Sequence, residues 1–145
     1  MFCITILINK MKSITIKEQF NVHPKILYKA WLDSKVHSEM TGGQAECSAE
    51  VNGEFSAWDG YIRGRNLELI PNKKIVQSWR TTDFSEDDSD SELIIEFTSA
   101  EEGCLLTLTH NNIPAGQPDY KKGWIDYYLK PMKKYFQDKY RSASR

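Results

Sequence analysis

The sequence predicts an α+β fold: a curved antiparallel sheet of about seven strands, two short helices, and a long C-terminal helix packed over the concave face of the sheet. Three observations predict it. Apolar and polar residues alternate in short segments, helical spacing appears in two separate stretches, and tight-turn residues divide the centre of the chain. Because the long helical stretch comes last, it is the element available to cover the inner face of a curling sheet.

The first part of the domain combines one strand with two short helices. Residues 13–19 alternate between apolar and polar side chains and predict a strand. The helical period then begins at Pro24, which suits a first helical turn because its missing N–H is not needed there. A second helical turn, within residues 34–41, is predicted to end at Gly42 and Gly43.

Six further strands with short connections are predicted in the centre of the chain. Turns are expected where Gly, Asn and Pro cluster, at Asn52–Gly53, Asp59–Gly60, Pro71–Asn72 and Glu102–Gly103. The predicted strands are residues 45–51, 54–59, 61–70, 73–82, 91–100 and 104–112. The one long connection, from Asp83 to Glu92, is acidic and is interpreted as a solvated loop, because it lacks the placed Gly and Glu of a calcium loop.

Residues 118–140 predict a long amphipathic helix whose aromatic residues recur at helical spacing. Pro131 lies inside it and cannot donate to the carbonyl of Tyr127, so a bend or local loosening is expected about one turn to either side. Gly123 is expected to let the helix backbone approach the sheet closely. The last residues, 141–145, are interpreted as a tail.

Residues 1–12 are interpreted as an N-terminal extension, with an extra strand as the alternative. The apolar run from Phe2 to Ile8 is far shorter than the roughly 20 residues that span a bilayer, and it lacks the pattern of a secretory signal. Met11 opens a segment that starts as such domains usually start, which makes translation from Met11 a hypothesis. A single domain over residues 13–140 is expected.

Composition excludes several classes of protein. With 19 basic and 20 acidic residues the formal net charge is −1, so neither a nucleic acid nor a membrane is expected as a partner. The three cysteines form no CxxC pair, which argues against a disulfide framework or a thiolate zinc site and favours a reducing, cytoplasmic compartment. P-loop, HExxH, GxSxG and dinucleotide motifs are absent, so no cofactor is predicted.

Four ordered segments resemble the activator of heat-shock-protein-90 ATPase homologue family: GEFSAWDGYIRG, LELIPNKKIVQSWR, LTLTHNNIP and GWIDYYLKPMKKYF. The resemblance covers roughly Ser13 to Tyr140 and implies the helix-grip fold of the START-like, Bet v-like (SRPBCC) superfamily. The residues that match the family's motifs are Gly53, Phe55, Asp59, Gly60, Pro71, Ile75, Val76, Trp79, Arg80, His110, Pro114, Gly123 and Trp124.

The implied fold places a groove between the sheet and the final helix. Trp79 is expected to face that helix, as core and as a cavity wall whose N–H is available to a ligand, whereas Arg80 is expected on the opposite face beside an acidic side chain. His110 is interpreted as structural, because no nucleophile stands at a recognisable spacing from it. No catalytic or metal-binding residue is predicted. The predicted ligand cavity is lined by Tyr28, Trp31, Trp58, Trp79, His110, Trp124, Tyr127, Tyr128 and Met132.

Three functions stay open. The favoured one is a non-enzymatic binding module resembling the C-terminal domain of the chaperone ATPase activators, with a co-chaperone or stress-response role and a heat-shock-protein-90-type chaperone as partner. The N-terminal activator domain of those proteins has no counterpart in this sequence, so weak activation is expected. The alternatives are a carrier or sensor of a small hydrophobic ligand in the sheet–helix cavity and, third, a polyketide-cyclase-like enzyme.

Overall fold

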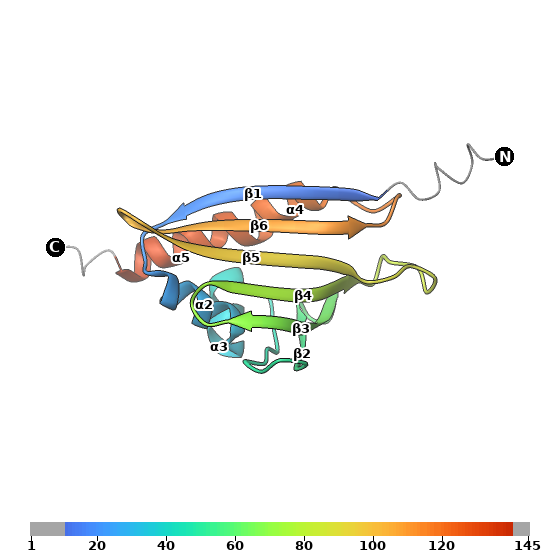
Figure 1. Cartoon of the computed structure of the whole chain (residues 1–145), viewed down its shortest axis with the longest axis horizontal. Coiled ribbons are helices and arrows are strands. Elements are labelled where there is room, and N and C mark those ends of the chain that lie inside the picture. Colours follow the sequence, from blue (N-terminus) through green and yellow to red (C-terminus); the bar gives the residue numbers. More distant parts are fainter. Residues whose placement is uncertain (1–10, 141–145) are drawn as a thin grey trace.

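The computed structural model describes residues 11–140, which form one sheet, two short helices and a long C-terminal helix, and it confirms the predicted α+β fold (Figure 1). The predicted tail and residues 1–10 of the predicted extension lie outside the described residues; Lys12 already belongs to the first strand. The elements are β1 (Lys12–Phe20), α2 (Pro24–Leu32), α3 (Ser34–Thr41), β2 (Glu54–Ala57), β3 (Ile62–Ile70), β4 (Lys74–Thr81), β5 (Ser91–Ala100), β6 (Gly103–Ile113), α4 (Tyr120–Trp124), the π-helix η1 (Ile125–Leu129) and α5 (Lys130–Tyr140).

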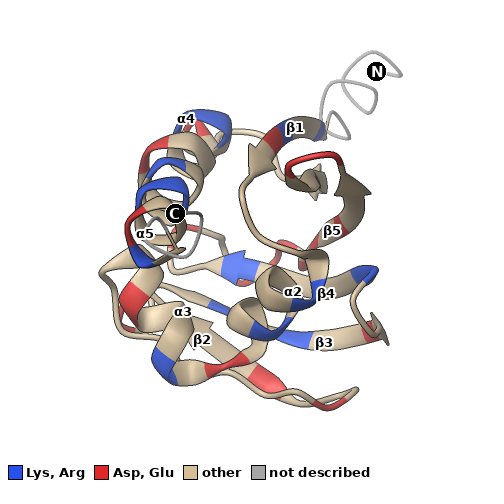
Figure 2. Cartoon of the chain, turned by 90° about the vertical axis from the view of Figure 1, so that its left-hand side faces the viewer, with Lys and Arg blue, Asp and Glu red and all other residues tan. Residues whose placement is uncertain are grey.

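The sheet has six strands in the order β1-β6-β5-β4-β3-β2, and each neighbouring pair is antiparallel. Strands β2 to β6 therefore form the predicted meander, and β1 extends it beyond β6. Each predicted turn contains a residue with left-handed backbone: φ is 70° at Asn52, 58° at Asp59, 65° at Asn72 and 140° at Gly103. Figure 2 shows the sheet curling around the core, with the C-terminal helix on its open side.

The strand predicted at residues 45–51 is wrong, because this segment forms only one isolated bridge, to β2. The side-chain amide of Asn66 on β3 supplies the physical reason. Its Nδ2 donates to the backbone carbonyl of Ser48 at 2.8 Å and to that of Glu50 at 2.9 Å. A side chain thus satisfies carbonyls that a strand would pair in a ladder.

The same Asn66 side chain connects this segment to the core. Its Oδ1 accepts from Nε2 of Gln77 at 2.9 Å, and Oε1 of Gln77 accepts from the indole N–H of Trp31 at 3.3 Å. Asn66 and Gln77 are 0% and 2% exposed. Each of these buried amides has hydrogen-bond partners, so the network tolerates burial.

Side-chain caps define the two short helices. His23 precedes Pro24 and its Nδ1 accepts from the backbone N–H of Lys25 at 3.0 Å, which starts α2. Asp33 ends α2 and also caps α3, because its Oδ1 accepts from the N–H of Val36 at 2.9 Å. Gly42, with φ of 90°, ends α3 as predicted.

The C-terminal helix contains a π-helical turn, η1, directly before Pro131. The N–H of Lys130 donates to the carbonyl of Ile125, five residues back, and Pro131 has no N–H to offer. The loosening expected near Pro131 is therefore confirmed. The close approach expected at Gly123 is wrong, because a Cβ built there would meet no atom within 4 Å.

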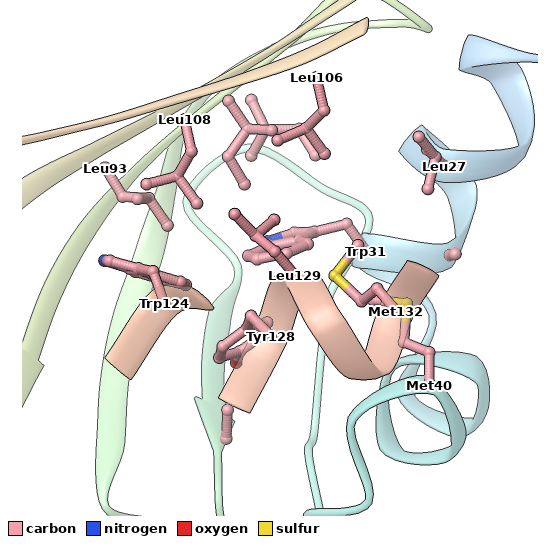
Figure 3. Packing of buried hydrophobic residues seen from close by; sticks show 14 of the residues in the cluster. Leu27, Trp31, Met40, Leu93, Leu106, Leu108, Trp124, Tyr128, Leu129 and Met132 are labelled. Atoms are coloured by element: carbon pink, nitrogen blue, oxygen red, sulfur yellow. The ribbon is translucent and has the colours of Figure 1, made fainter. Parts of the chain in front are cut away.

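The core lies between the sheet and the helices. Figure 3 shows Leu93 and Leu108 extending from the sheet toward Leu129 on the C-terminal helix, with Leu27 of α2 at one side. These leucines are between 0% and 2% exposed. Burial of this kind supplies most of the free energy that holds the C-terminal helix on the sheet.

Candidate functional site

Trp79 and Arg80 are neighbours on β4 that point to opposite faces of the sheet. Trp79 is 3% exposed, and its ring centroid lies 5.5 Å from that of Trp124 and 4.4 Å from that of His110. Arg80 turns toward the loop after β4, where its Nη1 donates to Oδ1 of Asp90 at 2.7 Å. The indole therefore belongs to the core, and the guanidinium organises the acidic loop.

A groove of about 420 Å³ opens beside the start of the C-terminal helix. Its walls come from the turn after β2, from β3 and β4, and from α4 and η1. Seven lining residues are aromatic and none is charged, and a volume of this size is within the range of small-molecule sites. The lining residues are Trp58, Tyr61, Ile62, Trp79, Tyr120, Gly123, Trp124, Tyr127 and Tyr128.

The buried part of the groove is held by hydrogen bonds to two histidines that do not line it. The indole N–H of Trp124 donates to Nδ1 of His110 at 3.0 Å. The hydroxyl of Tyr128 is hydrogen-bonded to Nε2 of His37 at 3.0 Å. Because these polar atoms are paired with the histidines, Trp124 and Tyr128 offer the groove mainly carbon.

Both histidines are held uncharged at neutral pH. Burial lowers the pKa of His110 to about 4, and burial also lowers the pKa of His37. Since Nδ1 of His110 accepts from Trp124, the ring proton lies on Nε2, which donates to Oγ of Ser91 at 2.8 Å. That Oγ in turn donates to the backbone carbonyl of Trp79 at 2.7 Å. His110 thus links the helix to two strands, in agreement with a structural role.

Trp58 lines the groove and has an unusual backbone conformation. Its φ is 50°, a left-handed value that bulky residues rarely adopt. A Cβ at Gly43 would overlap the indole ring, so only glycine leaves room for it. Tyr127 packs edge-on against the indole, with ring centroids 5.7 Å apart. The Nε1 atom of Trp58 is buried and has no hydrogen-bond partner among residues 11–140.

Tyrosine hydroxyls connect the groove to the loop after β4. The hydroxyl of Tyr61 donates to Oδ2 of Asp83 at 2.5 Å. Burial is the main cause that raises the pKa of Tyr61, and this hydrogen bond is the second. The hydroxyl of Tyr120 donates to Oε1 of Gln117 at 2.7 Å and is hydrogen-bonded to Oγ1 of Thr81 at 2.8 Å. These bonds fix both rings in the wall of the groove.

The structure brings together part of the predicted cavity. The predicted residues that line the groove are Trp58, Trp79, Trp124, Tyr127 and Tyr128. The predicted residues that do not line it are Tyr28, Trp31, His110 and Met132. Tyr28 borders a separate depression of about 520 Å³ between α2 and α5. The other three are packed in the core, with exposures of 3% for Trp31 and 0% for His110 and Met132.

Four lining residues were missed from the sequence: Tyr61, Ile62, Tyr120 and Gly123. Tyr61 and Ile62 follow the Asp59–Gly60 turn, which places them opposite the start of the C-terminal helix. Gly123 was the feature of the sequence that could have indicated this part of the groove, because a glycine within an aromatic helix face leaves a gap on that face. Here the gap belongs to the groove.

The cysteine thiols of the described residues are poor nucleophiles. Burial raises the pKa of Cys47 to about 12 and that of Cys104 to about 11, so both thiols are protonated at neutral pH. Among residues 11–140, no three His, Cys, Asp or Glu side chains are grouped to hold a metal ion. No helix within the same residues has the length and apolar character needed to cross a membrane.

Comparisons with known sequences point to one family. A family model described as "Activator of Hsp90 ATPase homolog 1-like protein" matches residues 21–137. The Homo sapiens "Activator of 90 kDa heat shock protein ATPase homolog 1" is 28% identical over 124 residues, covering 85% of this chain and 36% of the human protein. The chain therefore spans about a third of the length of the curated relatives it matches first.

Solved structures agree with the fold. An "HSP90 activator" from Plasmodium falciparum superposes with a TM-score of 0.75 at 34% identity, covering 83% of this chain and 92% of that one. The Aha1 dimer from Colwellia psychrerythraea superposes with a TM-score of 0.70, covering 88% of this chain and 95% of that one. At 15% identity, the second similarity concerns the fold alone.

Proposed function

Because the chain belongs to the activator of Hsp90 ATPase homologue 1-like family, we propose that it is a non-enzymatic module that binds a heat-shock-protein-90-type chaperone in the cytoplasm and acts in the stress response. The observation that carries the proposal is the similarity to the Plasmodium HSP90 activator, which combines 34% identity with matching architecture over 83% of this chain. The two buried histidines are hydrogen-bonded to side chains of the protein and the thiols are protonated, which supports a binding role.

The acidic loop between β4 and β5, residues 82–90, is the surface that we assign to electrostatic steering of the chaperone. It carries five carboxylates, and Glu86 and Asp87 are exposed at its tip. Arg80 holds the loop in shape through bonds to Asp90 and to the carbonyl of Ser85 at 3.0 Å. A fixed cluster of negative charge accelerates association with a basic patch, and salt screens the effect.

We expect the purified protein to bind the chaperone from the same source weakly and to raise its ATP turnover modestly. Replacing Glu86 by Gln and Asp87 by Asn should lower the association rate severalfold at low salt, because two steering charges are lost. The difference should shrink as ionic strength rises. Surface plasmon resonance across a salt series measures the association rate, and an ATP hydrolysis assay at the same salt concentrations measures the turnover.

The matched control removes two other exposed carboxylates, Glu101 and Glu102, in the β5–β6 hairpin. Figure 1 places this hairpin at the opposite end of the sheet from the acidic loop. Glu101→Gln with Glu102→Gln changes net charge equally and should leave the association rate nearly unchanged. Equal slowing by both pairs would contradict a steering role for the loop, and no binding at low salt would contradict the chaperone proposal itself.

The groove favours a second candidate function, a carrier or sensor of a small hydrophobic ligand. Its aromatic lining and its volume of about 420 Å³ support this function. A ligand present at 100 times its Kd should stabilise the protein by about 2.7 kcal/mol against thermal unfolding.

A thermal-shift screen with neutral hydrophobic compounds tests the groove, with Gly123→Leu as the blocked variant. A Cβ at Gly123 meets open space, and leucine favours the helix over glycine by roughly 1 kcal/mol, so this variant should fold. Compounds that stabilise the native protein should not stabilise Gly123→Leu. If the blocked variant responds equally, the compounds bind elsewhere and the carrier function is contradicted.

A further inference from the structure

One residue that lines the groove carries a hydrogen-bond donor that the described part of the protein does not use. Trp58 Nε1 is a buried side-chain donor without an acceptor among residues 11–140. Three neighbouring polar atoms have partners: the indole N–H of Trp124 pairs with His110, the hydroxyl of Tyr128 with His37, and that of Tyr61 with Asp83. A buried donor that lacks an acceptor is costly, and native proteins retain few of them.

The position of the Trp58 ring is itself imposed by the fold. The backbone at Trp58 is left-handed, with φ of 50°, and the adjacent Asp59 and Gly60 are left-handed too, at 58° and 92°. A Cβ at Gly43 would overlap the ring, so the glycine leaves the space in which the indole lies. Strained backbone next to a cavity is more common at binding sites than elsewhere.

The chemistry of the walls limits what can occupy the groove. No Lys, Arg, Asp or Glu is among the lining residues, so a charged ligand would lose its hydration without gaining a counter-charge. The aromatic side chains favour a ligand with its own ring system, packed edge-on or offset. The unused indole N–H calls for one acceptor oxygen on that ligand.

We propose that the groove binds a neutral, ring-containing apolar molecule that carries a carbonyl-type acceptor, and that this acceptor takes the hydrogen bond of Trp58 Nε1. The inference rests on the second proposed function, the small-molecule groove, and adds the chemical class of the ligand and its anchoring residue.

Because the Trp58 nitrogen is buried in the structure, the proposal requires a neighbouring side chain to move. We assign this movement to Tyr127, because its ring packs on Trp58 with centroids 5.7 Å apart and the residue is 61% exposed. Rotation of so exposed a ring into solvent gives up little burial. The ligand's ring then replaces the Tyr127 ring against Trp58, and its carbonyl meets the N–H.

The test uses two neutral fluorescent probes of nearly equal shape. One is prodan, a naphthyl ketone, and the other is the same molecule with its carbonyl reduced to a methylene. Equilibrium dialysis gives the affinity of each for the native protein and for Trp58→Phe, which keeps an aromatic ring and removes the N–H. The ratio of ketone to methylene affinity should fall about tenfold in Trp58→Phe, the value of one neutral hydrogen bond.

Three further variants separate this inference from the function on which it rests. Tyr28→Phe removes a hydroxyl in the separate depression and should leave both affinities unchanged. Gly123→Leu should abolish binding of both probes, and Gly123→Ala should weaken it less. If both probes bind the native protein and are blocked by Gly123→Leu, but the affinity ratio changes less than twofold in Trp58→Phe, the groove stands and the acceptor inference is overturned. If neither probe binds the native protein, both are overturned.

A measurement on the native protein keeps the test decisive should Trp58→Phe fold poorly. The indole N–H proton of Trp58 should move downfield in the NMR spectrum when prodan binds, because a new hydrogen bond deshields it. The methylene probe should not produce that shift. Equal shifts with both probes would overturn the assigned hydrogen bond.

Discussion

Replacing Trp124 by alanine is expected to lower the free energy of unfolding by about 3–5 kcal/mol, the range of large aromatic truncations in cores. Trp124 is 3% exposed, and its ring centroid lies 4.8 Å from that of Tyr128 and 5.5 Å from that of Trp79. The truncation would also leave Nδ1 of His110 without its donor. Urea unfolding followed by circular dichroism measures the loss.

Two companion variants identify the cause. Trp124→Phe keeps most of the ring contacts but removes the N–H, so it should cost less than the alanine variant and more than a surface change. Lys121→Ala, at an exposed position of the same helix, should change stability by less than about 0.5 kcal/mol. A comparably small loss for Trp124→Ala would mean that the anchor of the helix lies elsewhere.

Acidification from pH 6.5 to 4 is expected to destabilise the protein by about 3 kcal/mol through His110, since each pKa unit corresponds to 1.36 kcal/mol. Burial lowers the pKa of His110 from 6.5 to about 4 in the folded state. Between those values the unfolded chain binds the proton and the folded chain does not, so stability is full above pH 6.5 and falls as pH decreases. The lowered pKa of His37 acts in the same direction.

Urea titrations at several pH values measure this slope. In His110→Gln the amide can still accept from Trp124 and donate to Ser91, but it cannot titrate. The variant should therefore lose up to about 1.4 kcal/mol per pH unit of the native slope in this window. His37→Gln should reduce what remains. If the slope of His110→Gln equals that of the native protein, His110 does not carry the acid sensitivity.

The order of elements was predictable because it depends on local patterns. Alternation, the glycine and asparagine turns and the helical spacing of the last stretch are each local patterns of about ten residues, and they place all six strands of the sheet and the helices. The strand predicted at residues 45–51 is wrong because its carbonyls bind a side chain, that of Asn66, from another strand. Such a competitor for backbone carbonyls is invisible in the local pattern.

The candidate groove was only partly predictable for a related reason. Aromatic residues on the inner faces were identified, but spacing does not distinguish Trp31 and Met132, which pack in the core, from Trp124 and Tyr128, which border the groove. The left-handed backbone of Trp58 was also missed, because propensity places a tryptophan in the strand rather than in the turn. The positions of neighbouring elements decide both which aromatic residues border the groove and which backbone conformation Trp58 adopts.

The π-helical turn changes the direction in which the side chains after it point around the axis of the C-terminal helix. Five of its six buried aromatic and apolar side chains fall at intervals of four residues, with Leu129 as the exception: Tyr120, Trp124, Tyr128, Met132 and Phe136. Each interval of four advances about 40° around an ideal α-helix, so the last of them would lie about 160° from the first, nearly on the opposite side. A wider turn in the middle reverses part of that drift. One face of the helix can therefore stay on the sheet from end to end, while Tyr127 faces outward beside the groove.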